Sequence, residues 1–351
     1  MILPDTESIL HRLGWDDGWN AAFAEHRAAG LAPARVSAQH RGAYDLLGEA
    51  GEIRAPAAAH LARNDALPAV GDWVGIADGL IEAVLPRRTH ISRKEVFDVV
   101  REQVLAANID VAFLVQGLPH DYNLRRLERY LAMAWESGAQ PVVVLTKTDL
   151  VDDVAPYVDE VETVTLGACA VIALSALTGE HLDEVRPFLD GNRTAVLLGS
   201  SGVGKSTLVN SLAGEELLAV KEVREDDHHG RHTTTHRQLI VLEGGGVILD
   251  TPGMRELQLW EADLGQTFAD VEEIAAACRF SDCAHGAEPG CAVQDALADG
   301  TLAQERWDSY VKLQRELAAL EARKDPLLRQ EQQREWKIRE RANRQTFKKK
   351  R

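Results

Sequence analysis

The stretch GSSGVGKST, residues 199 to 207, most constrains the fold of this chain of 351 residues. It matches G-x-x-x-x-G-K-S and lies between the apolar run TAVLL and the helix-like STLVNSLAG, as a phosphate-binding loop requires. Backbone N–H groups of such a loop surround the β-phosphate of a nucleoside triphosphate. The expected ligand-binding residues here are Gly199, Ser200, Ser201, Gly202, Val203, Gly204, Lys205, Ser206 and Thr207. Lys205 is expected to neutralise β- and γ-oxygens and Ser206 to bind Mg²⁺.

Two upstream segments predict that the base is guanine. In TKTD, residues 146 to 149, the Asp149 carboxylate can accept the two donors that guanine presents, and the Lys147 stem can lie against the base. In SALTG, the N–H of Ala176 can reach guanine O6. Both segments follow apolar strands, at the sheet edge where doubly wound folds bind ligands. The expected GTP-binding residues from these segments are Thr146, Lys147, Asp149, Ser175, Ala176 and Leu177.

Two downstream segments predict contacts to the γ-phosphate and its magnesium. VILDTPG places Asp250 at a strand end, where it can hold Mg²⁺ through water, and the N–H of Gly253 within reach of the γ-phosphate. One residue of the run Thr233, Thr234 and Thr235 should contact Mg²⁺; Thr234 and Thr235 are favoured and stay unseparated. These segments would order around the triphosphate and relax after hydrolysis.

The order of these motifs predicts a circular permutation. An ordinary GTPase runs from the phosphate loop through the switches to the base loops, whereas here the base loops at 146 and 175 come first. Strands alternate with helices over this region, so an α/β domain with a mainly parallel sheet is expected at residues 93–260. The run RQLIVL, 237 to 242, is expected as a further strand, an antiparallel edge.

The segments on either side of residues 93–260 predict additional domains. Residues 1–32 form a helical extension, with Trp15, Trp19 and Phe23 as a packing stripe at a spacing of four. Short strands and glycine turns over 33–92 indicate a small all-β barrel, for which a five-stranded oligonucleotide-binding barrel fits the length. Residues 261–333 form a helical domain and 334–351 a basic tail.

A cysteine cluster predicts a metal site in the helical domain. CRFSDCAHGAEPGC offers Cys278, Cys283, His285 and Cys291 within fourteen residues. Three thiolates and one imidazole suit tetrahedral Zn²⁺ and leave no open position, so one structural zinc is expected.

Charge and hydropathy restrict the partners. The chain has a net charge of −16, but the tail from Arg334 to Arg351 holds nine basic against two acidic residues, so the rest carries −23. By itself such a basic block can be a nucleic-acid contact or a merely solvated end. If the partner is RNA, the acidic remainder favours localized contacts and the tail adds a salt-dependent contribution. No apolar run is long enough to span a membrane, and the start lacks the pattern of a secretory signal, so a cytoplasmic protein with no membrane partner is expected. A monomer is expected as well, although no sequence feature specifies the oligomeric state.

The motifs VGDWV, QVLAANID, TKTD, SALTG, GSSGVGKST, GRHTTT and DTPG, with the cysteine cluster, resemble the ribosome small-subunit-dependent GTPase A family. The resemblance covers about residues 33 to 320 and concerns circularly permuted GTPases of bacterial ribosome biogenesis. It implies an N-terminal oligonucleotide-binding barrel, a permuted P-loop GTPase domain and a C-terminal zinc domain. The implied partners are GTP or GDP, the small ribosomal subunit and its rRNA.

The catalytic residues predicted are Lys205, Thr234, Thr235 and His232. Met254 follows DTPG, where many GTPases place glutamine, and a thioether cannot orient a water. Slow intrinsic turnover is therefore expected. His232 is the candidate to position the water, a role its family counterpart suggests, with His228, His229 and His236 as alternatives.

Two function classes follow. The first is a GTPase that binds the small ribosomal subunit during late maturation and hydrolyses GTP to GDP and phosphate, stimulated by the subunit. The second is a GTP-dependent RNA-binding or RNA-chaperone protein in which hydrolysis is incidental. A zinc-handling GTPase is disfavoured because the predicted metal cage is closed.

Overall fold

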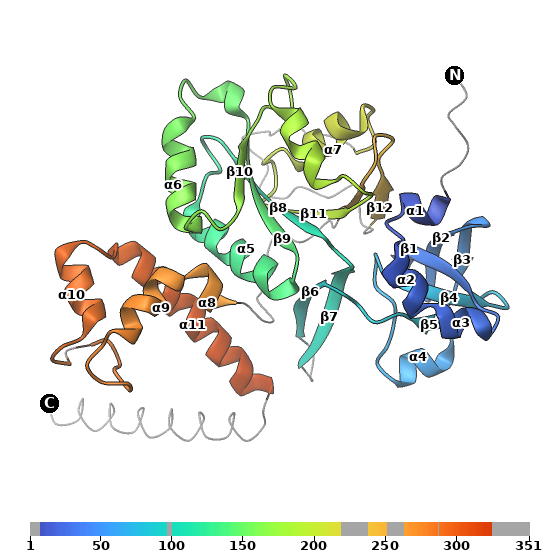
Figure 1. Cartoon of the computed structure of the whole chain (residues 1–351), viewed down its shortest axis with the longest axis horizontal. Helices are drawn as coiled ribbons and strands as arrows, with labels where there is room; N and C mark the ends of the chain where they lie inside the picture. The colour runs from blue at the N-terminus through green and yellow to red at the C-terminus, as the bar shows by residue number, and fades with distance from the viewer. Residues whose placement is uncertain (1–7, 97–99, 219–237, 251–262, 287, 325–351) are drawn as a thin grey trace, which may run out of the picture. The chain divides into compact units, whose positions relative to one another are not determined.

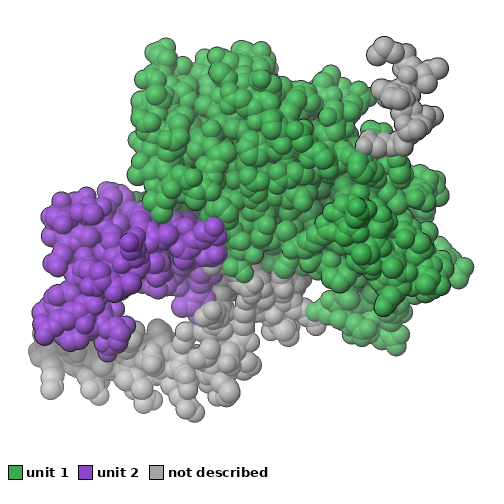
Figure 2. All heavy atoms as spheres, viewed as in Figure 1, with its two compact units in different colours: residues 1–92, 104–257 green, residues 93–103, 258–351 purple. Residues whose placement is uncertain are grey.

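The computed structural model describes residues 8–96, 100–218, 238–250, 263–286 and 288–324. The chain divides into two compact units, one of residues 1–92 and 104–257 and the other of residues 93–103 and 258–351 (Figure 2). The first unit contains the barrel and the nucleotide motifs, and the second contains the cysteine cluster.

The first unit contains a five-stranded barrel (Figure 1). Its elements are β1 (Ala32–His40), β2 (Ala43–Gly48), β3 (Gly51–Ala55), α4 (Ala59–Arg63), β4 (Trp73–Ala77) and β5 (Leu80–Val84). The strands pair antiparallel in the order β3-β2-β1-β4-β5, and a parallel bridge between Ala57 and Ile81 brings the end after β3 against β5. Alternate residues such as Val36, Leu46 and Val74 fill the interior. The predicted all-β barrel is confirmed.

Three short helices precede the barrel: α1 (Ile9–Arg12), α2 (Asp17–Ala22) and α3 (Ala24–Ala28). The predicted aromatic stripe packs against Trp73 of β4, with the Trp15 and Trp73 rings 4.7 Å apart and those of Trp15 and Phe23 5.7 Å apart. Trp19 is also buried. The stripe is therefore part of the core.

The nucleotide motifs belong to a sheet ordered β10-β9-β8-β11-β13-β12. Its strands are β8 (Val111–Gly117), β9 (Gln140–Thr146), β10 (Ala170–Ala173), β11 (Thr194–Leu198), β12 (Gln238–Val241) and β13 (Val247–Asp250). All neighbouring pairs are parallel except β12 with β13. β8 and β11 are buried throughout because helices cover both faces, which is why they are continuous apolar runs.

Helices cover this sheet on both sides (Figure 1). They are α5 (Leu124–Ser137), η1 (Thr148–Leu150), α6 (Ala155–Thr165), η2 (Leu182–Phe188) and α7 (Lys205–Ala213). Leu208 and Leu212 of α7 pack with Val185 of η2 on the face formed by Val111, Phe113 and their neighbours. α5 and α6 contact β8, β9 and β10. The predicted permuted α/β domain is confirmed.

β12 was predicted to be an antiparallel edge strand, and the edge assignment is wrong. It pairs antiparallel with β13 as expected, but its other side pairs with β1 of the barrel, where Ala38 lies opposite Gln238. The sheet therefore continues from the nucleotide motifs into the barrel as β13-β12-β1-β2-β3. Sequence patterns carry no information about which distant strand covers an edge.

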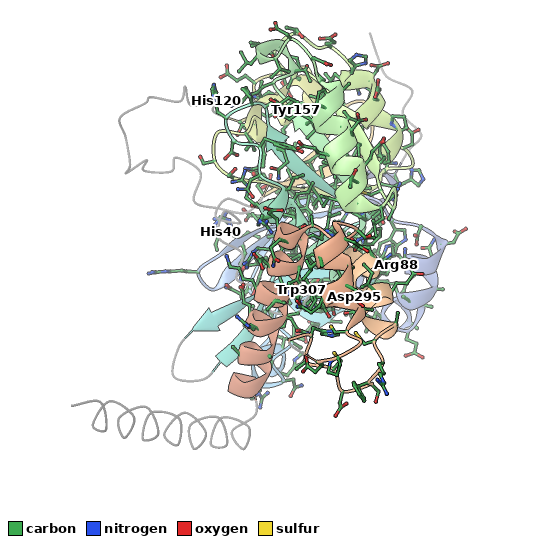
Figure 3. The ribbon with its side chains drawn as sticks, turned by 90° about the vertical axis from the view of Figure 1, so that its left-hand side faces the viewer. His40, Arg88, His120, Tyr157, Asp295 and Trp307 are labelled. Atoms are coloured by element: carbon green, nitrogen blue, oxygen red, sulfur yellow. The ribbon has the colours of Figure 1, made fainter. Side chains whose placement is uncertain are left out.

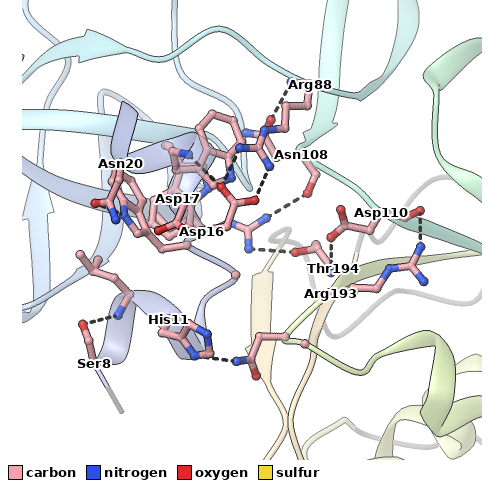
Figure 4. A pocket seen from close by; sticks show the side chains of 18 of the residues that line it. Ser8, His11, Asp16, Asp17, Asn20, Arg88, Asn108, Asp110, Arg193 and Thr194 are labelled. Carbon is pink, nitrogen blue, oxygen red and sulfur yellow. Dashed lines mark hydrogen bonds and ion pairs between the residues drawn. The ribbon is translucent and has the colours of Figure 1, made fainter. Parts of the chain in front are cut away.

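A two-stranded sheet of β6 (His90–Val96) and β7 (Val100–Ala107) follows the barrel along the chain and was not predicted; its residues 93–103 belong to the second unit. A pocket of about 570 Å³ lies in the first unit between the N-terminal helices, the barrel and the start of β11 (Figure 4). Asp16, Arg88, Asp110 and Thr194 line it. Thr194 begins β11 and the phosphate loop follows its end, so this pocket is separate from the nucleotide motifs.

The C-terminal part of the second unit is helical, with α8 (Leu264–Thr267), α9 (Ala269–Ala276), α10 (Ala292–Asp299) and α11 (Gln304–Lys324). Phe268, Val271, Val293 and Leu313 are buried at its centre. Figure 3 shows Trp307 of α11 and Asp295 of α10 in this unit. Across the described ranges of both units, no helix is both long and apolar enough to cross a membrane.

Candidate functional site

The phosphate loop connects the end of β11 to the start of α7, as predicted. Gly199 packs so closely that a Cβ there would lie 2.6 Å from the carbonyl oxygen of Val115, which explains why only glycine fits. Gly204 has φ of 103° and directly precedes α7. Ser206 and Thr207 lie in the first turn of this helix, whose free N–H groups favour an anion.

Lys205 is folded back onto its own loop. Its Nζ donates to the carbonyl oxygens of Gly199 at 2.7 Å and of Ser200 at 2.5 Å. The ammonium therefore lies against the first two residues of the loop, where it can turn toward phosphate oxygens.

The two segments predicted to recognise the base meet. Ser175 Oγ donates to Asp149 Oδ1 at 2.6 Å, and the N–H of Thr178 donates to Ser175 Oγ at 3.2 Å. Ser175 is fully buried and Ala176 nearly so, whereas Leu177 is 78% exposed. Ser175 therefore holds the Asp149 carboxylate through one of its two oxygens. A carboxylate is suited to accept two aligned donors such as those of guanine.

The base-recognition segment after β9 also contacts the phosphate loop. Lys147 Nζ donates to the carbonyl oxygen of Gly202 at 2.6 Å, and Thr146 Oγ1 donates to the carbonyl oxygen of Val203. Lys147 has φ of 63°, a left-handed conformation at the turn that follows the strand. Residues more than fifty positions apart therefore form one continuous site along the carboxyl ends of β9 and β11.

Asp250 ends β13, which is parallel to β11 and next to it. Burial raises the pKa of Asp250, while the positive charge of Lys205 opposes this shift. A carboxylate next to the phosphate loop can hold a hydrated divalent ion. The other predicted switch and catalytic residues, namely His232, Thr234, Thr235 and Gly253, lie outside the described residues, as do Thr233 and Met254.

The four predicted metal ligands come together in the second unit. Their ligand atoms all lie within 4.8 Å of one another. Cys278 Sγ is 3.5 Å from His285 Nδ1 and 3.9 Å from Cys291 Sγ. A tetrahedral ion with arms of about 2.3 Å has ligands roughly 3.8 Å apart, so the donor set fits one zinc-sized ion.

Neighbouring groups contact both the backbone and the ring of His285. Gln294 Nε2 donates to the carbonyl oxygen of His285 at 2.8 Å, and the Trp307 ring meets the His285 ring edge-on at 5.5 Å. Cys291 is buried and directly precedes the first turn of α10. The cluster could therefore hold a metal ion that links the loop from 278 to 291 to α10 and α11.

The contact of Asp121 with the phosphate loop was not predicted. Ser200 Oγ donates a hydrogen bond to Asp121 Oδ2. Asp121 follows β8, at the same sheet edge as the nucleotide motifs. The sequence offers one signal for this contact, a carboxylate four residues after a buried parallel strand. No motif distinguishes this carboxylate from others that follow strands.

Comparison with known proteins identifies the family of this chain. The family model described as RsgA GTPase matches residues 84–260. A protein from Opitutus terrae named small ribosomal subunit biogenesis GTPase RsgA is 48% identical over 349 residues, covering 93% of this chain and 95% of that protein. A protein of the same name from Streptomyces avermitilis is 46% identical and covers 92% of this chain and 90% of its own length.

Solved structures show the same fold. The crystal structure of YjeQ from Thermotoga maritima has a TM-score of 0.61 and 28% identity, covering 82% of this chain and 99% of that one. The structure of YloQ, described as a circularly permuted GTPase, has a TM-score of 0.57 and 24% identity, with 84% and 96% coverage. The family model and the 48% identical relative from Opitutus terrae, in agreement with the motif order along the chain, show that the chain belongs to the RsgA GTPase family.

Proposed function

We propose that this protein hydrolyses GTP to GDP and phosphate and acts in late maturation of the small ribosomal subunit, which stimulates its turnover. The observation that carries the GTPase assignment is the junction of the two base-recognition segments with the phosphate loop, through Asp149 with Ser175 and Lys147 with Gly202. The names of the relatives support the ribosomal role.

The residue roles are part of this proposal. Asp149 and Ala176 read guanine, residues 199–207 hold the phosphates, and Ser206, Asp250 and Thr234 or Thr235 bind Mg²⁺. His232 orients the attacking water. The cluster of Cys278, Cys283, His285 and Cys291 holds one structural zinc, for which its spacing and chemistry are suited.

The proposed setting is the cytoplasm, where the protein works as a monomer and contacts the rRNA of the subunit. The barrel is one RNA-binding module and the basic tail from Arg334 a second, and linking the modules raises overall affinity when both engage. The strongly acidic remainder restricts RNA contacts to localized surfaces.

The deciding experiment measures GTP turnover by the full-length protein with and without purified small subunits. Strong stimulation by the subunit, absent with large subunits at equal concentration, supports the proposal. Subunit binding without stimulation would instead support the second function class, a GTP-dependent RNA-binding protein with incidental hydrolysis.

A further inference from the structure

The loop between β8 and α5 contacts the first half of the phosphate loop. The Asp121 carboxylate accepts a hydrogen bond from Ser200 Oγ through its Oδ2 atom. The same Oδ2 lies 3.1 Å from Nη2 of Arg126, and that group also donates to the Asp121 carbonyl oxygen. Arg126 thereby offsets the negative charge that Asp121 places near a phosphate site.

The position of this carboxylate is set by the surrounding backbone. The N–H of Asp121 donates to the carbonyl oxygen of Gly117 at 3.0 Å, and the N–H of Asn123 donates to Gln116 Oε1 at 3.1 Å. Asn123 Oδ1 accepts from the N–H of Arg126 at 2.9 Å and so caps α5. The carboxylate is therefore anchored to the sheet on one side and to the first turn of α5 on the other.

Ser200 is held from two directions. Its hydroxyl is directed to Asp121, and its carbonyl oxygen accepts from Lys205. Lys147 and Thr146 hold the second half of the loop at Gly202 and Val203. The hydrogen bond from Ser200 Oγ to Asp121 does not involve Lys205, so it would remain if the ammonium turned toward phosphate oxygens.

We propose that Asp121 is a positioning residue that holds the first half of the phosphate loop in the conformation that receives the β-phosphate. The inference rests on the proposed function, because it requires the phosphate loop to bind GTP and GDP. A loop that is already ordered loses less conformational entropy on binding, so its N–H groups bind phosphate more tightly. The tighter binding is expected only for ligands that carry a β-phosphate.

The test compares the affinities of GDP and GMP, measured by displacement of a fluorescent GDP. For Asp121→Ala we expect GDP affinity to fall about tenfold, equivalent to about 1.4 kcal/mol, which is of the size that hydrogen bonds to charged groups contribute. GMP affinity should change less than about twofold, because GMP lacks the β-phosphate. The ratio of the two affinities, rather than either alone, is the readout, since general loosening of the fold lowers both.

Further variants separate positioning from a structural role. Ser200→Ala should reproduce the effect, and the double variant should be no worse than either single variant, since both remove one interaction. Asp121→Asn keeps an acceptor oxygen and should restore most of the GDP affinity. Asp152→Asn, which removes an exposed carboxylate after η1, is the matched control and should leave the ratio unchanged.

Each contrary outcome has its own meaning. Equal affinity of the unaltered protein for GDP and GMP would overturn the assignment of residues 199–207 as the phosphate site. The unaltered protein is expected to bind GDP more tightly than GMP. If Asp121→Ala and Ser200→Ala keep the same ratio of the two affinities, only the role of Asp121 is overturned. If the losses of GDP affinity add in the double variant, the role of Asp121 is likewise contradicted. Ser200→Ala supplies the test if Asp121→Ala does not fold.

Discussion

Arg35 donates a hydrogen bond from Nη1 to Thr194 Oγ1 at 2.8 Å and so joins the first strand of the barrel to the strand that leads into the phosphate loop. The guanidinium is fully buried and also donates to the carbonyl oxygens of Leu13, Gly71 and Asn108. Burial lowers the pKa of Arg35 to about 10, so the group stays charged at neutral pH. One side chain therefore ties the N-terminal helices, the barrel and β11 together.

Replacing Arg35 by methionine should lower the free energy of unfolding by about 3 kcal/mol, because several buried carbonyl oxygens lose their donor. Urea denaturation measures this loss. Arg63→Met, at an exposed position in α4, is the control and should stay within about 0.5 kcal/mol of the unaltered protein. A loss for Arg35→Met no larger than that of the control would show that the buried guanidinium does not stabilise the junction.

Asp149→Asn should shift the base preference from guanine toward xanthine. The amide can no longer accept two donors, but its NH₂ can donate to the carbonyl that xanthine carries in place of the guanine amino group. We expect GTP affinity to fall about 100-fold and XTP affinity to rise, as judged by competition binding. Asp152→Asn should leave both affinities unchanged, and retained GTP preference in Asp149→Asn would exclude Asp149 as the residue that reads the base.

Cys283→Ser should remove the metal and loosen the second unit. Folding of small metal domains is coupled to binding, so loss of one of four ligands lowers metal content and helicity together. Elemental analysis should find about one zinc per chain in the unaltered protein, as a closed four-ligand site predicts, and far less in the variant. Cys169→Ser, outside the cluster, should retain the zinc; equal zinc in both variants would contradict the assignment.

His232→Ala should abolish turnover stimulated by the small subunit and spare GTP binding, because the imidazole is expected to orient the water and not to contact the nucleotide. Single-turnover hydrolysis with subunits present, together with GTP affinity, gives the two readouts. His236→Ala is the comparison, since the sequence leaves it open as an alternative. Unchanged stimulated turnover in His232→Ala would assign the role elsewhere.

Asp45 should make the barrel sensitive to acid. Its carboxylate accepts from Arg54 Nε at 2.6 Å and lies 2.6 Å from His40 Nε2. The hydrogen bond from Arg54, with a further contribution from His40, lowers the pKa of Asp45 from 3.8 to about 2. The stabilisation is therefore complete above pH 3.8 and is lost as the pH falls toward 2.

This pH dependence is measured as the difference in free energy of unfolding between the unaltered protein and Asp45→Asn at low salt. The difference should be constant at higher pH and shrink between pH 3.8 and about 2. Since the pair is partly exposed, added salt should reduce it. A difference that does not vary with pH would show that Asp45 has the same pKa in the folded and unfolded chain.

The nucleotide motifs and the metal cluster could be predicted from sequence because their chemistry is local. Nine consecutive residues form the phosphate loop, and four ligands within fourteen residues form the cluster. The order of the motifs along the chain further determined the circular permutation, since each motif marks a known position in the sheet.

Only the tertiary structure decided how these parts are joined. The pairing of β1 with β12, the contact of Arg35 with Thr194 across 159 positions, and that of Asp121 with Ser200 across 79 depend on strands brought together from distant parts of the chain. Arginine is usually exposed, so nothing near Arg35 in the sequence indicates its burial. Hydropathy patterns specify which face of a strand is buried, but not which distant strand or side chain it meets.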